Sequence, residues 1–269
     1  MPIGNLGDIT LRALETLRNA DLIAAEDTRK TRFLLSQYEI KPRRLLSLHK
    51  YNETKRLAEI LALLADGKDI AVVSDAGSPG ISDPAIILVR AAIQNNFKVV
   101  PLPGATALIP ALTGAGLDTG SFLFLGFLPL KQKDRRKQLQ IISSCPHTVA
   151  LYEAPHRLKQ TLEDILAACG DRQVCLAREI SKLHEEFIRG QLQEILADYS
   201  VTEKGEFVVL IESARPPEPA SEEEITRFIA ALEADGASSK ELAAKVSSRF
   251  GISRNLAYKL VLSTRKRSG

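Results

Sequence analysis

The feature that most constrains the fold is an alternation of short apolar runs with helical patterns over the first hundred residues. The runs Leu22–Ala25, Ile70–Val73 and Val99–Val100 have the length of buried strands. Helical patterns surround them at Ile9–Asn19, Arg56–Ala65 and Pro84–Gln94, the last opened by Ser82 or Asp83. Short apolar strands that alternate with helices are typical of a parallel sheet covered on both faces. We therefore expect an α/β domain over residues 1–106.

The same pattern restarts in the next hundred residues. Four more runs have strand character and one segment has a helical pattern. The runs are Phe122–Leu125, Val149–Tyr152, Val174–Ala177 and Phe207–Glu212, and the helix is Arg157–Ala168. We expect a second α/β domain over residues 107–213, although no loose linker marks its boundary.

The remainder of the chain is of a different kind. Residues 214–220 contain three prolines and read as an extended linker. After them, residues 221–269 contain only helical patterns, in which Ser238–Phe250 and Arg254–Ser263 are joined by a tight turn at Gly251. This layout is typical of a helix-turn-helix module.

Composition excludes several classes of protein. Three scattered cysteines and four dispersed histidines suggest neither a disulfide scaffold nor a metal site. No apolar run is long enough to span a bilayer, and the first residues lack the pattern of a signal peptide. We therefore expect a cytoplasmic protein without a membrane partner.

Basic residues gather in two places although the net charge is only +3. Residues 131–137 contain five cations, and from Gly236 onward only one acidic residue, Glu241, remains. Such segments suit contact with RNA phosphates, although a solvated charged face explains them equally well.

Three turns rich in glycine and proline follow the expected strands or begin the chain: Pro2–Gly7, Ser74–Pro84 and Pro101–Gly104. Ligands of parallel sheets bind beyond the carboxyl ends of the strands, and glycine lets a ligand approach the backbone closely. One such turn is an ordinary connection between a strand and a helix, but three together indicate a small-molecule site. The phosphate-loop and dinucleotide-binding motifs are absent from the sequence, so neither ATP nor NAD is indicated.

Seven segments together resemble the rRNA 2′-O-methyltransferases of the tetrapyrrole methylase superfamily, over essentially the whole chain. They are Pro2–Ile9, Ala25–Arg29, Val73–Pro84, Pro101–Gly104, Gly126–Pro129, Tyr152–Arg157 and Ala177–Lys182. The resemblance implies a parallel sheet in the first domain, a mixed sheet in the second, and a homodimer. It also implies that S-adenosylmethionine binds between the domains and that the substrate is a cytidine ribose in the decoding region of small-subunit (16S) rRNA, free or in the 30S subunit.

The resemblance also implies which residues contact the cofactor. They are Ile3, Gly4, Asp75, Gly77, Ser78, Pro79, Pro103, Gly104, Ala105, Thr106 and Tyr152. One departure concerns the first turn: relatives carry a strand and a threonine before it, and here Met1 stands in the threonine's place. We therefore expect the first sheet to lack one central strand and to expose an edge.

Methyl transfer to a ribose hydroxyl needs positioning and help with deprotonation. The candidates are the carboxylates at expected strand ends, Glu26, Asp27, Glu153 and Glu179, with Asp27 and Glu153 preferred to Glu179. Each has a structural alternative: a helix cap for Glu26 or Asp27, a helix start near Glu153, and an ion pair of Glu179 with Arg178. The cations expected to contact RNA are Arg29, Lys30, Arg135, Arg136, Arg157, Arg254 and Lys259.

Two other functions remain open. A methylase acting on a tetrapyrrole would use the same cofactor, but it would not need the basic segments. A non-catalytic nucleic-acid-binding regulator would use the terminal helices, but it would not need two α/β domains.

Overall fold

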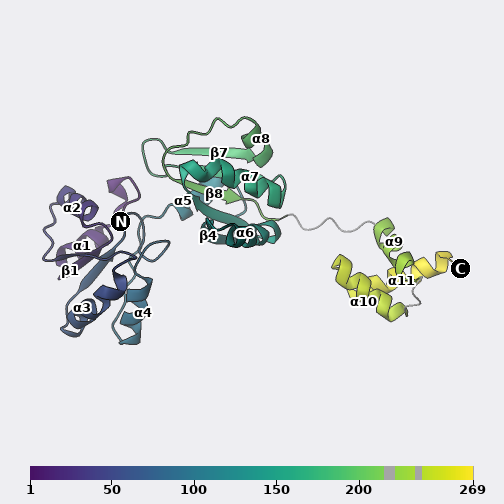
Figure 1. Ribbon diagram of the computed structural model, residues 1–269, viewed down its shortest axis with the longest axis horizontal. Helices are drawn as coiled ribbons and strands as arrows, with labels where there is room; N and C mark the ends of the chain where they lie inside the picture. Colours follow the sequence, from purple (N-terminus) through teal and green to yellow (C-terminus); the bar gives the residue numbers. More distant parts are fainter. Residues whose placement is uncertain (215–221, 234–237, 269) are drawn as a thin grey trace. The chain divides into compact units, whose positions relative to one another are not determined.

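The computed structural model describes residues 1–214, 222–233 and 238–268, and the expected linker, 214–220, lies almost wholly outside these residues. The contacts divide the chain into two units, Met1–Ala214 and Arg215–Gly269 (Figure 1). The first unit contains a three-stranded parallel sheet and a five-stranded mixed sheet, each covered by helices. The α/β fold class is thereby confirmed. The expected boundary at residues 106 and 107 lies inside this unit, between the two sheets, and we call the parts on either side the first and second lobes.

The first lobe is built on parallel strands in the order β2-β1-β3. The strands are β1 (Leu22–Ala25), β2 (Leu45–Ser47) and β3 (Ile70–Val73). The helices are α1 (Leu11–Asn19), α2 (Thr28–Gln37), α3 (Glu53–Ala65) and α4 (Ile86–Gln94), and a 3₁₀ turn spans Leu6–Asp8. All four residues of β1 are buried because α1 and α2 pack on one face of the sheet, whereas α3 and α4 pack on the other.

The strand expected at Val99–Val100 is absent, so that prediction is wrong. Both side chains are exposed, and the segment pairs with no described strand. Within the described residues β3 pairs only with β1, which leaves its other edge open. A strand exists through the hydrogen bonds it exchanges with a neighbour, and no described strand lies beside this segment to supply them.

Helix α4 begins at Ile86, two residues later than expected, and neither Ser82 nor Asp83 caps it. Ala85, the residue before the helix, has a φ of 127°, which separates Pro84 from the helical backbone. The cap comes instead from α3: the buried Glu53 carboxylate accepts a hydrogen bond from the Leu88 N–H at 3.0 Å. A carboxylate at a helix N-terminus satisfies a free N–H and meets the positive end of the helix dipole.

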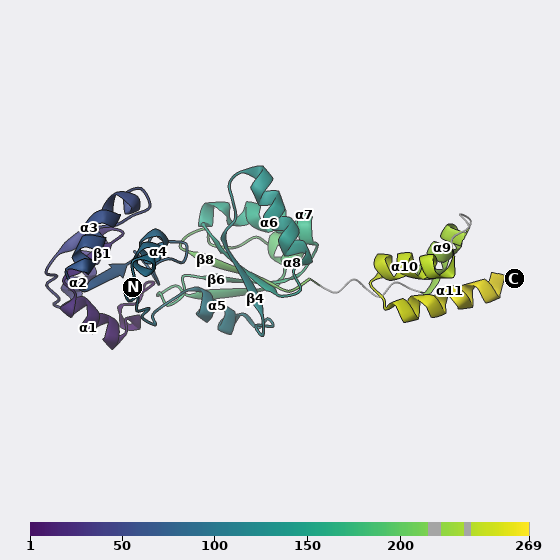
Figure 2. The same ribbon diagram turned by 90° about the horizontal axis from the view of Figure 1, so that it is seen from below.

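The second lobe contains strands in the order β4-β5-β8-β6-β7, in which β4 pairs with β5 in parallel and the other neighbouring strands pair antiparallel. They span Phe122–Phe127 (β4), Thr148–Glu153 (β5), Gln173–Arg178 (β6), Glu186–Gln191 (β7) and Phe207–Ile211 (β8). The helices are α5 (Leu108–Ala115), α6 (Gln132–Ser144), α7 (Leu158–Cys169) and α8 (Leu192–Ala197), with a 3₁₀ turn at Pro155–Arg157. Figure 2 shows α5 on one face of this sheet and α6 and α7 on the other, in agreement with two separate apolar clusters.

The second unit is a small helical bundle of α9 (Glu222–Glu233), α10 (Ser239–Phe250) and α11 (Arg254–Ser268). Ser238 and Glu241 form a capping box at the start of α10, and Gly251 ends that helix with a φ of 65°. The helix, tight turn and helix expected here are confirmed. Leu242, Val246 and Ala257 belong to a core of this unit's own, so it has the means to fold independently.

Calorimetry checks this independence with Leu242→Ala. The substitution removes a fully buried side chain from the core of the second unit and should cost about 2–5 kcal/mol of unfolding free energy. One unfolding transition should shift by several degrees while the other stays in place. Ser248→Ala, at an exposed position of the same helix, should shift neither. A common shift of both transitions under Leu242→Ala would show that the units unfold as one.

Candidate functional site

An open pocket of about 690 Å³ lies between the two lobes of the first unit. Its walls come from the first turn, the start of α2, the end of β3 and the loops beside β6 and β8. The lining residues are Met1, Pro2, Ile3, Gly4, Leu6, Asp27, Arg29, Lys30, Phe33, Leu34, Asp75, Ala76, Lys182 and Glu206. Both charged and apolar side chains therefore face the same space.

Lys182 of the second lobe crosses directly over Gly4 of the first. A Cβ atom built on Gly4 would overlap the lysine's Cγ, and its Cδ and Cε would lie within 3 Å. Gly4 also has a φ of 154°. The neighbouring Ser181 hydroxyl donates a hydrogen bond to Asp8 of the first lobe. The absence of a side chain at Gly4 thus allows this close contact between the lobes.

The three turns expected to form a ligand site do meet one another. Met1 and Gly77 exchange both backbone hydrogen bonds, at 2.7 and 3.0 Å. A Cβ on Gly77 would lie 3.5 Å from the Ala105 carbonyl oxygen and 3.6 Å from Cγ2 of Ile3. Ile3 of the first turn and Ala105, the residue directly after the third turn, therefore both lie close to Gly77, whose φ of 71° favours glycine.

Tyr152 approaches the third turn from the second lobe. Its ring packs against Phe124 and Phe127, with centroids 4.9 and 5.7 Å away. Burial raises the pKa of the Tyr152 hydroxyl, and the neighbouring Thr106 hydroxyl partly offsets this effect. The structure thus brings together Thr106 and Tyr152, two of the expected cofactor contacts, beside the N-terminus of α5, which no side chain caps.

Acidic side chains gather beside these turns. Burial, together with repulsion from Glu26 and Asp75, raises the pKa of Asp83 to about 6. The negative charge of Asp83 also helps to raise the pKa of Tyr152 in the second lobe. Glu26 accepts a hydrogen bond from the Asp75 N–H at 3.1 Å, and Asp75 accepts one from the Asp27 N–H at 3.0 Å. This arrangement concentrates negative charge at the carboxyl ends of β1 and β3.

Asp27 and Asp75 are each paired with a cation of α2. Asp27 caps the helix, and its two oxygens accept hydrogen bonds from the Arg29 backbone and guanidinium at 2.8 to 3.1 Å. These contacts hold the pKa of Asp27 well below its usual range. Lys30 donates to Asp75 at 2.7 Å. Asp27 therefore lines the pocket as the N-cap of α2, which was the structural alternative for this residue. It is poorly suited to accept a proton while Arg29 is bound to its carboxylate.

Glu153, Arg135 and Arg157 lie in a buried network away from the pocket lining. Glu153 is 2% exposed and accepts hydrogen bonds from the Thr161 hydroxyl at 2.6 Å and the Ala154 N–H at 2.8 Å. Arg135 is 6% exposed and donates to Asp164 and Thr161. Arg157 donates to the Leu128 carbonyl and lies 3.3 Å from Glu153. These partners occupy the charged groups of all three residues within the second lobe, and none of the three is among the residues that line the pocket.

Glu179 lies at the pocket's edge, in contact with Lys182. The Lys182 ammonium is 2.7 Å from Glu179 and 3.0 Å from Glu206. Burial opposes the charge on Lys182, but the two carboxylates together raise its pKa above the usual lysine value. Lys182 is therefore a fixed cation in the pocket wall. Glu179 pairs with it and not with Arg178 as expected, because the Arg178 guanidinium binds Glu186 at 2.9 Å.

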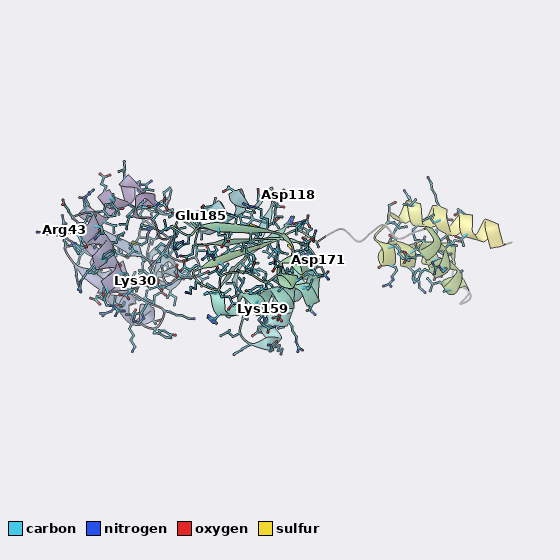
Figure 3. All side chains as sticks on the ribbon, turned by 90° about the horizontal axis from the view of Figure 1, so that it is seen from above. Lys30, Arg43, Asp118, Lys159, Asp171 and Glu185 are labelled. Atoms are coloured by element: carbon cyan, nitrogen blue, oxygen red, sulfur yellow. The ribbon has the colours of Figure 1, made fainter. Side chains whose placement is uncertain are left out.

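The remaining basic residues expected to bind RNA are exposed. Arg136 lies on α6, and Arg254 and Lys259 lie on α11 of the second unit. Figure 3 labels Lys30, which lies at the start of α2 with its side chain 64% exposed.

Among the residues of this region that were not expected at the site are Phe33, Asp83 and Lys182. Lys182 ends a segment that carries the family resemblance, which was a usable signal, and Asp83 belongs to another such segment. Phe33 lies on α2, a helix that was not predicted from the sequence, and only its exposed place in the pocket wall distinguishes it.

The raised pKa of Asp83 predicts a pH-dependent effect of Asp83→Asn on stability. The folded state binds the Asp83 proton more tightly than the unfolded state, so wild-type stability falls as pH rises from about 4 through about 6. Asparagine does not ionise, so the variant is spared this loss of stability at high pH. Urea unfolding should therefore show a more stable variant at pH 8 and little difference at pH 4. Asp66→Asn, at an exposed site, is the control, and an equal effect of Asp83→Asn at both pH values would contradict the prediction.

Comparisons with known proteins agree with this geometry. Residues 1–196 match the family described as Tetrapyrrole (Corrin/Porphyrin) Methylases. The chain is 45% identical to ribosomal RNA small subunit methyltransferase I of Synechocystis sp. over 97% of its own length and 95% of the relative's. It is 44% identical to the protein of that name from Escherichia coli O157:H7, over 97% and 92%.

Solved structures share the fold at low sequence identity. The methyltransferase CobJ has a TM-score of 0.57 and 22% identity, covering 79% of this chain and 92% of its own. Uroporphyrin-III C-methyl transferase from Thermus thermophilus, complexed with S-adenyl homocysteine, has a TM-score of 0.54 and 18% identity, covering 77% and 92%. The chain therefore belongs to the tetrapyrrole methylase family and, within it, to the ribosomal RNA small subunit methyltransferase I proteins.

Proposed function

We propose that this methyltransferase transfers a methyl group from S-adenosylmethionine to the ribose 2′-hydroxyl of a cytidine in the decoding region of small-subunit rRNA. The observation that carries the proposal is the pocket between the lobes, where glycine-rich turns meet exposed cations. The relatives' printed names support an rRNA substrate. Their close similarity over nearly the whole chain favours this function over that of a tetrapyrrole methylase.

The residues that would hold the cofactor fit its charges. The acidic side chains Glu26, Asp75 and Asp83 complement a sulfonium and an ammonium group, and the uncapped N-terminus of α5 suits a carboxylate. The proposed contacts are Ile3, Gly4, Asp75, Gly77, Ser78, Pro79, Pro103, Gly104, Ala105, Thr106 and Tyr152. When bound, S-adenosylmethionine supplies an electrophilic methyl group.

Lys182 would favour ionisation of the ribose hydroxyl. Its ammonium lines the pocket and stays charged, so it stabilises negative charge that develops on the nucleophile. Asp27 and Glu179 remain the candidates to accept the proton. A phosphate bound to Arg29 would compete with Asp27 for the guanidinium and so release the Asp27 carboxylate for this role.

RNA phosphates would bind Arg29 and Lys30 at the pocket and Arg136, Arg254 and Lys259 elsewhere on the surface. We place the enzyme in the cytoplasm as a homodimer, since its substrate is ribosomal and homodimers are common among the relatives it resembles. Among the described helices, none has the length and apolar character to cross a membrane.

A methylation assay tests the function. Purified protein is incubated with labelled S-adenosylmethionine and small subunits from a strain that lacks the activity, and the modified nucleotide is mapped. Label on one cytidine ribose supports the proposal. Cofactor binding with label on an added tetrapyrrole and none on RNA would contradict it.

Lys182→Ala tests the electrostatic role at the site. Loss of one donor that stabilises developing charge should lower the single-turnover rate of methyl transfer about 10²- to 10³-fold. Lys182→Arg should restore part of that rate because it keeps the charge. Lys204→Ala removes an exposed lysine outside the pocket lining and should leave the rate unchanged. A normal rate in Lys182→Ala would remove the lysine from the mechanism.

A further inference from the structure

Phe33 is an exposed aromatic side chain in the wall of the pocket. It is 63% exposed, although the side chains of Leu34 and Leu35 beside it on α2 are buried. Among the described residues, no aromatic ring or cation stacks on it. Single exposed apolar residues are common on protein surfaces, so exposure alone carries no meaning. Phe33, however, lines the same pocket as Gly4 and Asp75, and this position makes its exposure relevant to function.

Two cations accompany the ring on the same helix. Arg29 lies one helical turn before Phe33, and Lys30 lies three residues before it, so the three side chains share one face of α2. The Arg29 side chain is 88% exposed and that of Lys30 is 64% exposed. Ion pairs at such exposure contribute little to stability, so Arg29 and Lys30 can exchange their carboxylate partners for a phosphate at small cost.

An aromatic face next to exposed cations is the chemistry that binds an unstacked nucleotide. Proteins read single-stranded RNA by stacking bases on aromatic rings and by pairing cations with the backbone. Enzymes that act on a base within a duplex take that nucleotide out of the stack, and a ribose that enters a pocket between two lobes would bring its base out of the stack in the same way. An aromatic side chain at the pocket then replaces the stacking that the base has lost.

We infer that Phe33 is the stacking platform for the base of the nucleotide that is methylated, with Arg29 binding an adjacent phosphate. This inference rests on the proposed function. Under it, α2 contributes substrate recognition in addition to the helix cap at Asp27. The leading competing occupant is a second copy of this chain packed over Phe33, and the experiment separates the two.

Steady-state kinetics on small subunits that lack the modification test the inference with Phe33→Ala, Phe33→Leu and Phe33→Trp. Removal of the ring should raise the KM for subunits between about fivefold and a hundredfold, whether alanine or leucine replaces it. Tryptophan should keep the KM near the wild-type value because it retains a stacking face. Affinity for S-adenosylmethionine and molar mass in light scattering should not change in any variant.

Tyr51→Ala is the matched control, because Tyr51 is 87% exposed and lies outside the pocket lining. Its KM should equal that of the wild type. A KM within twofold of the wild type in Phe33→Ala, or full rescue by leucine, would overturn the inference, and a change in molar mass would assign Phe33 to a contact between copies. If the wild-type protein methylates no RNA, the proposed function itself fails.

The sequence contains no tryptophan, so Phe33→Trp also provides a single fluorescent reporter. Stacking of a base on the indole should quench its emission when an oligocytidylate is added. Tyr51→Trp, titrated in the same way, should keep its emission. Equal responses of the two reporters to bound oligonucleotide would contradict a platform at Phe33.

Discussion

The close passage of Lys182 over Gly4 is the contact on which the site depends. It brings a cation of the second lobe into a pocket whose remaining walls belong largely to the first lobe. Any side chain at Gly4 would occupy the space that the lysine's methylene groups fill. The diagnostic first turn therefore has a steric function in addition to any contact with a ligand. It determines how near the two lobes can approach each other.

Several features could be predicted because local sequence determines them. Ile70–Val73 is β-branched and bounded by polar residues, and the glycine and proline turns follow from backbone preferences. The capping box at Ser238 is likewise local. Strand β2 escaped prediction because its three residues are too few for a pattern, and β7 because its apolar residues are interrupted by Arg189 and Gly190.

The site was harder to predict because burial decides what a charged residue does. Glu153 and Arg135 follow the same kinds of pattern as exposed residues, yet their partners lie in other elements, Thr161 and Asp164 of α7. The segment at Val99–Val100 shows a second limit: a sequence typical of a strand forms no strand when no described strand lies beside it to exchange hydrogen bonds. Only one of the three turns, Ser74–Pro84, follows a strand of the parallel sheet, so the rule that ligands bind beyond the carboxyl ends of the strands applied to that turn alone. The first turn reaches it through the backbone hydrogen bonds between Met1 and Gly77, which the sequence does not reveal.

The cap on α4 has a consequence for how this lobe can vary. Because the Glu53 carboxylate of α3 accepts a hydrogen bond from an N-terminal N–H of α4, the two helices on that face are joined by a buried side chain. A deletion or insertion that shifts either helix by one residue would leave that charge without its partner, which is costly in a protein interior. Length changes in this part of the lobe should therefore be confined to the exposed segment around residues 95–100, where no such bond joins neighbouring elements.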